Sequence, residues 1–235
     1  AIAQLHVFKR SFDARRAGVQ AVYIVDVQLA DPGQEAALLA QHAQHPHIQP
    51  TPDMAWQPPV QAPATLAERP VVVGFGPCGI FAALVLAQMG FKPIVIERGK
   101  AVRERTQDTW GLWRQRQLNP ESNVQFGEGG AGTFSDGKLY SQIKDPRHLG
   151  RKVLQEFVDA GAPPEILYAA HPHIGTFRLV KMVENMRAQI IALGGEVRFG
   201  QRVEALELDA QRHLRALRVR DLASGQEHVL PTRHA

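Results

Sequence analysis

The segment from Val71 to Glu97 constrains this chain more than any other, because it reads as a complete strand–helix–strand unit. Three valines lead into Gly74, and Gly76 and Gly79 follow before an apolar helical sequence. A second apolar run then ends at Glu97, 18 residues after Gly79. Strand, glycine-rich turn, helix and strand in this order predict parallel strands whose first turn binds the pyrophosphate of a dinucleotide.

Each residue of that turn has an expected physical role. Gly74 permits the tight turn, Gly76 lets a pyrophosphate approach the backbone, and Gly79 brings the helix close to the sheet. The first turn of the helix, with Pro77 and Cys78, adds free N–H groups and the positive end of the helix dipole. We therefore expect all five residues to bind the cofactor.

Glu97 stands where a carboxylate can accept hydrogen bonds from both hydroxyls of an adenosine ribose, and Arg98 follows it directly. A carboxylate there would repel a 2′-phosphate, so the site favours FAD or NAD over NADP. A glycine-rich turn that binds no nucleotide is the alternative. The agreement of the strands, the glycines and Glu97 in order and spacing favours a binding site that includes both Glu97 and Arg98.

A second glycine cluster covers residues 127–137, where five of eleven residues are glycine. Such a loop exposes many backbone N–H groups and can wrap a phosphate–ribityl chain or a flat ring. A flexible surface loop is the alternative, but aromatic and apolar neighbours on both sides favour an ordered loop. The residues expected at the cofactor are Gly129, Gly130, Ala131, Gly132, Thr133 and Ser135.

Composition places the chain among globular proteins. Its 235 residues are 44% hydrophobic and 21% charged, as is usual for soluble domains. No apolar run approaches the roughly 18–20 residues of a membrane span, and the first residues lack a secretory signal. The single cysteine, Cys78, excludes an internal disulfide framework and favours a reducing compartment. We therefore expect a cytoplasmic protein with no membrane partner. The chain starts without Met, from which we expect a processed or cut N-terminus.

The net charge of +4 is small, because 27 basic residues are offset by 23 acidic ones. The densest basic cluster is Lys9, Arg10, Arg15 and Arg16. Nucleic-acid binding is one interpretation of this cluster. The spread of the other basic residues along the chain favours a solvated face instead.

Hydrophobic patterns divide the chain into three parts. Residues 1–48 read as a small α+β domain, 49–67 as a Pro-rich linker, and 68–235 as a Rossmann-like domain. Trp110 and Trp113 are expected to pack inside this last domain. Its further elements are expected as helices at 102–118, 147–160 and 177–193, a strand at 196–199, and a meander at 203–208, 214–221 and 227–230.

The two glycine clusters together resemble the FAD/NAD(P)-binding fold of glutathione-reductase type. More narrowly, four stretches resemble a bacterial family of uncharacterised FAD-dependent dehydrogenases: residues 123–139, 171–176, 9–15 and 22–27. The resemblance implies an α/β fold in which a small α+β N-terminal domain precedes a Rossmann-like domain with a β-meander.

The same resemblance implies FAD, with its ribose on Glu97, its pyrophosphate over residues 76–79 and its flavin or ribityl chain near residues 129–135. It implies an FAD-dependent oxidoreductase that transfers hydride through the flavin, with NAD(P)H as a candidate donor and an unidentified small-molecule substrate. Members of the family continue past residue 235, so we expect this chain to be a fragment that is inactive by itself.

No catalytic residue follows from the sequence. The C-x4-C pair of flavin-dependent disulfide reductases is lacking, which excludes that route. His171 or His173 could donate a proton near a flavin, but a plain loop role, with Thr176 capping the next helix, is the stronger interpretation. No metal site is expected, because no further ligands cluster there. Two other functions stay open, a flavin-dependent RNA-modifying or RNA-binding protein and a non-catalytic nucleotide-binding module.

Overall fold

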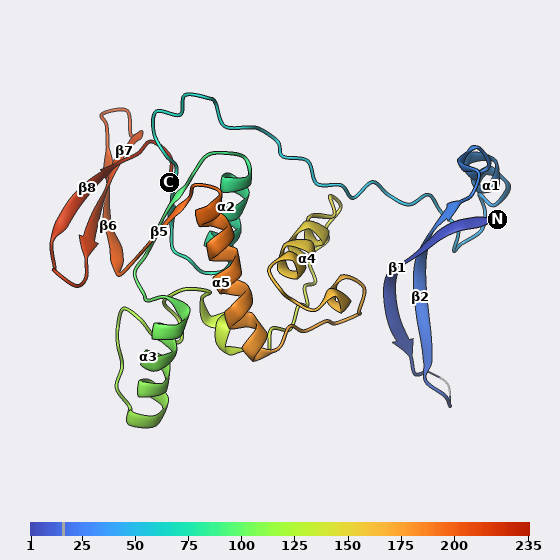
Figure 1. The fold of residues 1–235 in the computed structure, drawn as a ribbon, viewed down its shortest axis with the longest axis horizontal. Helices are drawn as coiled ribbons and strands as arrows, with labels where there is room; N and C mark the ends of the chain where they lie inside the picture. Colours follow the sequence, from blue (N-terminus) through green and yellow to red (C-terminus); the bar gives the residue numbers. More distant parts are fainter. Residues whose placement is uncertain (16) are drawn as a thin grey trace. The chain divides into compact units, whose positions relative to one another are not determined.

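The computed structural model describes residues 1–15 and 17–235, so Arg16 of the basic cluster lies outside the described residues. Contacts divide the described chain into two units. The first contains residues 1–56 and 138–173, and the second contains residues 57–137 and 174–235. Figure 1 shows the elements of both units, and each unit is described by itself below.

A short parallel sheet lies at the centre of the second unit. Its strands β3 (Val71–Val73), β4 (Ile94–Glu97) and β5 (Glu196–Phe199) are ordered β3-β4-β5, and both pairs are parallel. All four residues of β4 are buried, which explains the continuous apolar run that ends in a carboxylate. The helix α2 (Pro77–Gln88) connects β3 to β4, as the strand–helix–strand pattern predicts.

Two helices cover one face of this sheet. Helix α2 buries Ile80, Ala83, Leu84 and Ala87. It packs against α5 (Thr176–Ala192), whose buried side chains include Met186 and Ile190. The remaining helical elements of this unit are α3 (Val102–Gln115) and the short 3-10 helix η2 (Ala131–Phe134).

An antiparallel meander covers the other face. It consists of β6 (Gln201–Leu208), β7 (Leu214–Asp221) and β8 (Glu227–Pro231), and Figure 1 shows it beside the parallel sheet. Leu217 and Val219 of β7 are fully buried against Val71, Ile94 and Ile96 of the parallel sheet. The unit therefore has three layers, and the α/β class predicted from the sequence is confirmed.

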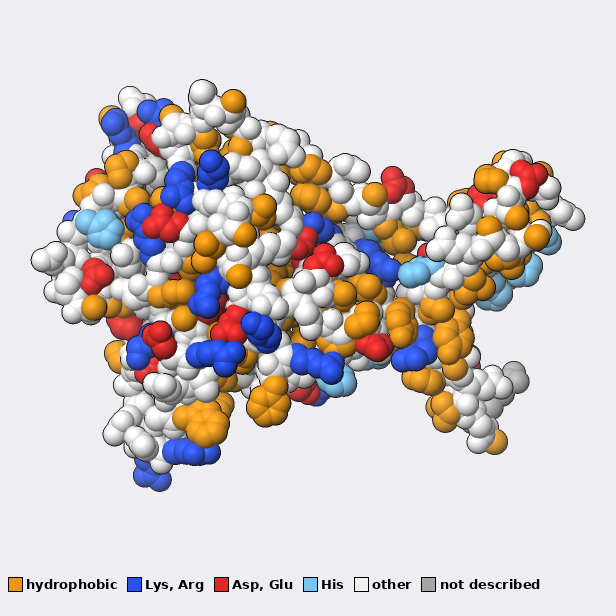
Figure 2. Space-filling model, viewed as in Figure 1, with side chains coloured by type: hydrophobic (Ala, Val, Ile, Leu, Met, Phe, Trp, Pro, Cys, Tyr) orange, Lys and Arg blue, Asp and Glu red, His pale blue; other side chains and the backbone are white. Residues whose placement is uncertain are grey.

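The first unit is built on a two-stranded antiparallel ribbon, β1 (Ile2–Asp13) and β2 (Gln20–Leu29). Hydrophobic side chains remain exposed along it, and they gather on its surface in Figure 2. The other elements of the unit are η1 (Pro32–Gln34), α1 (Glu35–Gln41), α4 (Leu149–Asp159) and η3 (Pro164–Leu167).

The division into units differs from the three-part division expected from the sequence, since residues 138–173 group with the N-terminal residues. Backbone pairing explains this. The N–H of Arg10 donates to the carbonyl of Tyr168 at 2.7 Å, and the N–H of Ala170 donates to the carbonyl of Arg10 at 2.9 Å. Within the second unit, the N–H of Ile174 donates to the carbonyl of Gly137 at 3.1 Å, so the two ends of the intervening segment meet.

Two local predictions were wrong. Trp110 and Trp113 are 46% and 59% exposed, and the residues that α3 buries are instead Val102, Arg105 and Thr109. Thr176 does not cap α5, because it is the first helical residue and the cap position is Gly175, with a φ of +93° and no side chain to accept a hydrogen bond.

Candidate functional site

A cavity of about 610 Å³ opens at the carboxyl ends of β3 and β4 in the second unit. This is the edge where open parallel sheets bind ligands. Five residues predicted from the sequence border it, namely Gly74, Gly76, Glu97, Arg98 and Gly130. The other lining residues are Val73, Ile96, Gln125, Phe126, Gly127, Gln201, Arg202, Val203 and Glu204.

The turn after β3 has the geometry that its glycines require. Gly74 has a φ of +95°, which favours glycine, and a Cβ at Gly79 would overlap the carbonyl oxygen of Gly74. Gly76 has neither requirement, since a Cβ there would lie 3.9 Å from its nearest atom, the Cα of Gly130, which is an ordinary van der Waals distance. The turn thus presents bare backbone to the cavity at Gly76.

Glu97 is buried at the end of β4, and both of its oxygens accept backbone hydrogen bonds. Oε2 accepts from the N–H of Phe75 at 2.6 Å, and Oε1 accepts from the N–H of Gly99 at 2.7 Å. Each carboxylate oxygen has a further lone pair, so these bonds leave acceptor capacity at a residue that lines the cavity. The carboxylate therefore shapes the turn as well as bordering the space in front of it.

The second glycine cluster lies directly against the first turn. The N–H of Gly129 donates to the carbonyl of Phe75 at 2.8 Å, and a Cβ at Gly130 would lie 3.0 Å from the Cδ of Pro77. A Cβ at Gly99 would overlap the backbone of Gly127. An added side chain at Gly99 or Gly130 would therefore be crowded by the facing segment.

Arg105 of α3 holds this second segment in place. It is fully buried, and its guanidinium donates to the carbonyls of Asn123 at 2.8 Å, Val124 at 2.6 Å and Glu128 at 2.6 Å. Burial lowers the pKa of Arg105 to about 10, and the charges of Glu97 and Glu128 partly oppose that change. The sequence does not reveal this residue, because a single Arg in an amphipathic helix normally faces water.

Glu128 is a fully buried acid whose charge acts on the buried Arg105. Its Oε2 accepts from the N–H of Val102 at 2.7 Å and from the guanidinium of Arg187 at 2.9 Å. Burial raises the pKa of Glu128, while the Val102 hydrogen bond and Arg187 act in the opposite direction. The acid sits at the start of α3, where the helix dipole favours negative charge. It links α3 and α5 to the glycine cluster.

The other predicted residues lie beside the cavity and do not border it. Pro77, Cys78 and Gly79 form the first turn of α2, with Cys78 exposed. In the second cluster the hydroxyl of Thr133 donates to the carbonyl of Glu128 at 3.4 Å, and the hydroxyl of Ser135 donates to the carbonyl of Gly132 at 2.7 Å. The members of that cluster outside the cavity lining are Gly129, Ala131, Gly132, Thr133 and Ser135.

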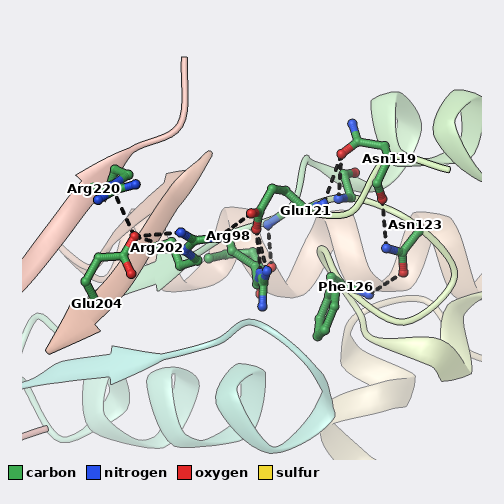
Figure 3. A network of polar contacts seen from close by, with 11 residues as sticks. Arg98, Asn119, Glu121, Asn123, Phe126, Arg202, Glu204 and Arg220 are labelled. Atoms are coloured by element: carbon green, nitrogen blue, oxygen red, sulfur yellow. Dashed lines mark hydrogen bonds and ion pairs between the residues drawn. The ribbon is translucent and has the colours of Figure 1, made fainter. Parts of the chain in front are cut away.

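A network of charged side chains forms one wall of the cavity (Figure 3). Arg98 and Arg202 both contact Glu121, and Arg202 also contacts Glu204, which in turn pairs with Arg220. The hydrogen bond from Arg202 lowers the pKa of Glu204, and the same bond raises the pKa of Arg202. Every charge in this wall therefore has a partner of opposite sign.

Sequence reasoning missed the β6 side of this cavity. Residues 201–204 follow β5, the third parallel strand, at the same edge of the sheet as Glu97. Their position after a predicted strand was the available signal, because the carboxyl ends of parallel strands share one edge. Glu121 lies in a loop without regular structure, and no pattern marks it.

The two histidines considered as proton donors lie in the first unit. The ring of His171 lies 4.8 Å from the ring of Tyr140, and His171 has a φ of +53°. The backbone of His173 forms an isolated antiparallel β-bridge with that of Lys138. Within the described part of the chain, no three His, Cys, Asp or Glu side chains come together as a metal site. Among residues 1–15 and 17–235, no helix is long and apolar enough to cross a lipid bilayer.

No family model matches the chain. A protein of Clostridium beijerinckii described as uncharacterized is 56% identical over 138 residues, which are 59% of this chain and 26% of that protein. The chain thus spans about a quarter of the length of the curated relative that it matches.

Among the solved structures that are similar to the chain, three illustrate the range. A 3-ketosteroid-delta4-(5alpha)-dehydrogenase of Rhodococcus jostii is 15% identical, with 74% of this chain and 47% of that chain covered and a TM-score of 0.45. A flavocytochrome c3 fumarate reductase is 14% identical, with 70% and 32% covered and a TM-score of 0.45. A glycerol-3-phosphate dehydrogenase of Bacillus halodurans complexed with FAD is 14% identical, with 71% and 33% covered and a TM-score of 0.37. At these identities and TM-scores, the cofactor has to be argued from the chain's own residues.

Proposed function

We propose that this chain binds FAD, with the adenosine diphosphate part of the cofactor in the cavity at the ends of β3 and β4. One observation supports this above all others. Gly76, at the start of α2, presents bare backbone to the same cavity that Glu97 borders. A pyrophosphate needs such a backbone approach at a helix N-terminus, and a ribose needs a nearby carboxylate.

The residues present fit this group. A side chain at Gly76 would fill the space that the pyrophosphate requires, whereas Gly74 is needed for its positive φ and Gly79 for its close packing on the Gly74 carbonyl. Free N–H groups at the start of α2 would face the phosphates, because the first turn of a helix has no internal acceptors for them. Glu97 would accept hydrogen bonds from the ribose hydroxyls, and the wall with Arg98 and Arg202 would border the adenosine.

FAD is preferred to NAD because of the second glycine cluster. The cluster packs directly on the pyrophosphate turn, through Gly129 and Gly130, and resembles the segment that approaches the flavin in FAD-dependent dehydrogenases. When bound, FAD supplies hydride transfer between a donor and a substrate. The function proposed for the whole protein is therefore that of a cytoplasmic FAD-dependent oxidoreductase, with NAD(P)H as candidate donor and a small molecule as substrate.

The cofactor assignment can be tested by titrating residues 1–235 with FAD, 5′-ADP and NAD while heat release is recorded. We expect FAD and 5′-ADP to bind at one site, with 5′-ADP displaced by FAD. NAD should bind more weakly than FAD. A chain that is folded by circular dichroism but binds neither FAD nor 5′-ADP would refute the proposal.

A further inference from the structure

Two guanidinium groups, those of Arg98 and Arg202, line the cavity, and both already form ion pairs with an acid. Arg98 donates from Nε to Oε2 of Glu121 at 2.7 Å, and Arg202 donates from Nη1 to the other carboxylate oxygen. Figure 3 shows Glu121 between the two arginines. One carboxylate thus joins the segment after β4 to β6 across the rim of the cavity.

Glu121 is itself held in position by its own loop. The backbone N–H groups of Glu121 and Ser122 donate to Oδ1 of Asn119 at 3.0 and 3.2 Å. The side-chain amide of Asn123 donates to the carbonyl of Asn119 at 2.9 Å. This turn fixes the backbone from which the Glu121 carboxylate extends.

The remaining contacts of the two arginines also restrain them. The Arg98 guanidinium lies over the ring of Phe126, 4.2 Å from its centre. Arg202 donates a second time, to Glu204 at 2.7 Å, and Glu204 pairs with Arg220 at 3.2 Å. The wall therefore alternates positive and negative groups, and Glu97 adds a further carboxylate to the lining of the same cavity.

We propose that Glu121 is a positioning residue that sets nucleotide specificity, by keeping Arg98 and Arg202 from binding a 2′-phosphate on the adenosine. This inference rests on the proposed function, because it assumes that the cavity holds an adenosine. Arginines beside the ribose are the groups with which dinucleotide sites accommodate a 2′-phosphate. Here the guanidinium groups of Arg98 and Arg202, which border the cavity, both form ion pairs with Glu121.

Removal of the Glu121 charge would take away the acid that pairs with both arginines. Glu204 would remain as a partner of Arg202, and within the described part of the chain Arg98 would keep its contact with the Phe126 ring. A planar guanidinium with free N–H groups is well suited to bind a phosphate with two parallel hydrogen bonds. The same wall would then attract the group that it rejects when Glu121 is charged.

The size of the effect is limited by water. The side chains of Arg98, Arg202 and Glu121 are 33%, 30% and 24% exposed, so their charges are partly screened. We therefore expect a change in specificity of roughly 1.5- to fivefold, the range for partly exposed ion pairs. High salt should reduce it, because salt screens exposed charges most.

The test measures the dissociation constants of 5′-ADP and adenosine 2′,5′-bisphosphate for residues 1–235 and for Glu121→Gln. The ratio of the two constants is the readout, because a purely structural role would weaken both ligands alike. The matched control is Glu184→Gln, which removes the same charge from a two-contact pair with Arg103 that does not line the cavity. We expect Glu121→Gln to shift the ratio toward the bisphosphate and the control to leave it unchanged.

An unchanged ratio in a folded Glu121→Gln chain that still binds 5′-ADP would overturn the inference and leave the proposed function intact. If the unaltered chain binds neither ligand, the proposed function itself fails. If Glu121→Gln does not fold, Glu121→Asp replaces it. Its shorter carboxylate can reach only one arginine, so the ratio should shift by a smaller amount, and the inference is refuted if it does not shift.

Discussion

The carboxylate of Glu97 accepts a 2.6 Å hydrogen bond from the backbone N–H of Phe75, which ties the end of β4 to the turn after β3. Its other oxygen holds the N–H of Gly99, so the same side chain also fixes the segment that follows β4. The predicted ribose ligand is therefore also a structural residue. Any substitution of Glu97 has to be assessed for binding and stability together.

Glu97→Gln keeps the size of the side chain but replaces one acceptor oxygen with a donor. One backbone N–H loses its partner, and we expect the free energy of unfolding to fall by about 1–3 kcal/mol. FAD binding should weaken by a further 1–3 kcal/mol or so, the scale of a lost hydrogen bond to a charged group. Urea unfolding and flavin titration measure the two effects. An unaltered FAD affinity would contradict the ribose assignment.

Two glycines of the first turn should respond oppositely to substitution. Gly76→Val adds a side chain whose Cβ meets its nearest atom at an ordinary van der Waals distance of 3.9 Å, so the chain should fold while nucleotide binding is lost. Gly79→Ala is the matched contrast, because its Cβ would overlap the Gly74 carbonyl, and we expect a loss of about 1–3 kcal/mol in stability. Circular dichroism and the ratio of flavin to protein report both. Retention of FAD by folded Gly76→Val would place the phosphates elsewhere.

Arg105→Met tests the support of the second glycine cluster. Methionine can fill part of the buried volume but leaves the carbonyls of Asn123, Val124 and Glu128 without the donors that hold them. We expect the free energy of unfolding to fall by about 3–5 kcal/mol, the cost of removing one partner from a buried charged network. Chemical unfolding measures the change. A loss below about 1 kcal/mol, which is usual at surface positions, would show that Arg105 does not hold the loop.

The raised pKa of Glu128 predicts a specific dependence of stability on pH. Because the folded-state pKa lies above the ordinary glutamate value, the contribution of Glu128 to stability is fully present below the ordinary value. It is lost as pH rises through the raised value. Glu128→Gln removes this titration.

The stability difference between the two chains should therefore shift in favour of Glu128→Gln as pH rises. Urea unfolding of both chains at about pH 4.5 and pH 7.5 measures it, with the lower value close to the ordinary glutamate pKa. Glu184→Gln serves as the control for removing a carboxylate near Arg187. A difference that does not vary with pH would show that burial does not perturb Glu128.

Local patterns predicted much of the fold because local chemistry determines it. The valines, glycines and Glu97 of the first βαβ unit are close in sequence, and strand, turn and helix form as expected. Arg105 and Glu121 could not be predicted in the same way. Their partners are loop carbonyls and residues distant in sequence, which only the folded chain brings together. Trp110 and Trp113 illustrate the converse, since their residue type suggests burial but α3 buries Val102, Arg105 and Thr109 instead.

The hydrogen bond between Ile174 and Gly137 has an evolutionary consequence. Residues 138–173 leave the second unit and return to it at neighbouring points, so their length and sequence can change without moving either end. The glycine cluster before them and α5 after them would keep their positions in such variants. A segment attached in this way could be exchanged as a module, which would leave the proposed cofactor site unchanged while the surface around it varies.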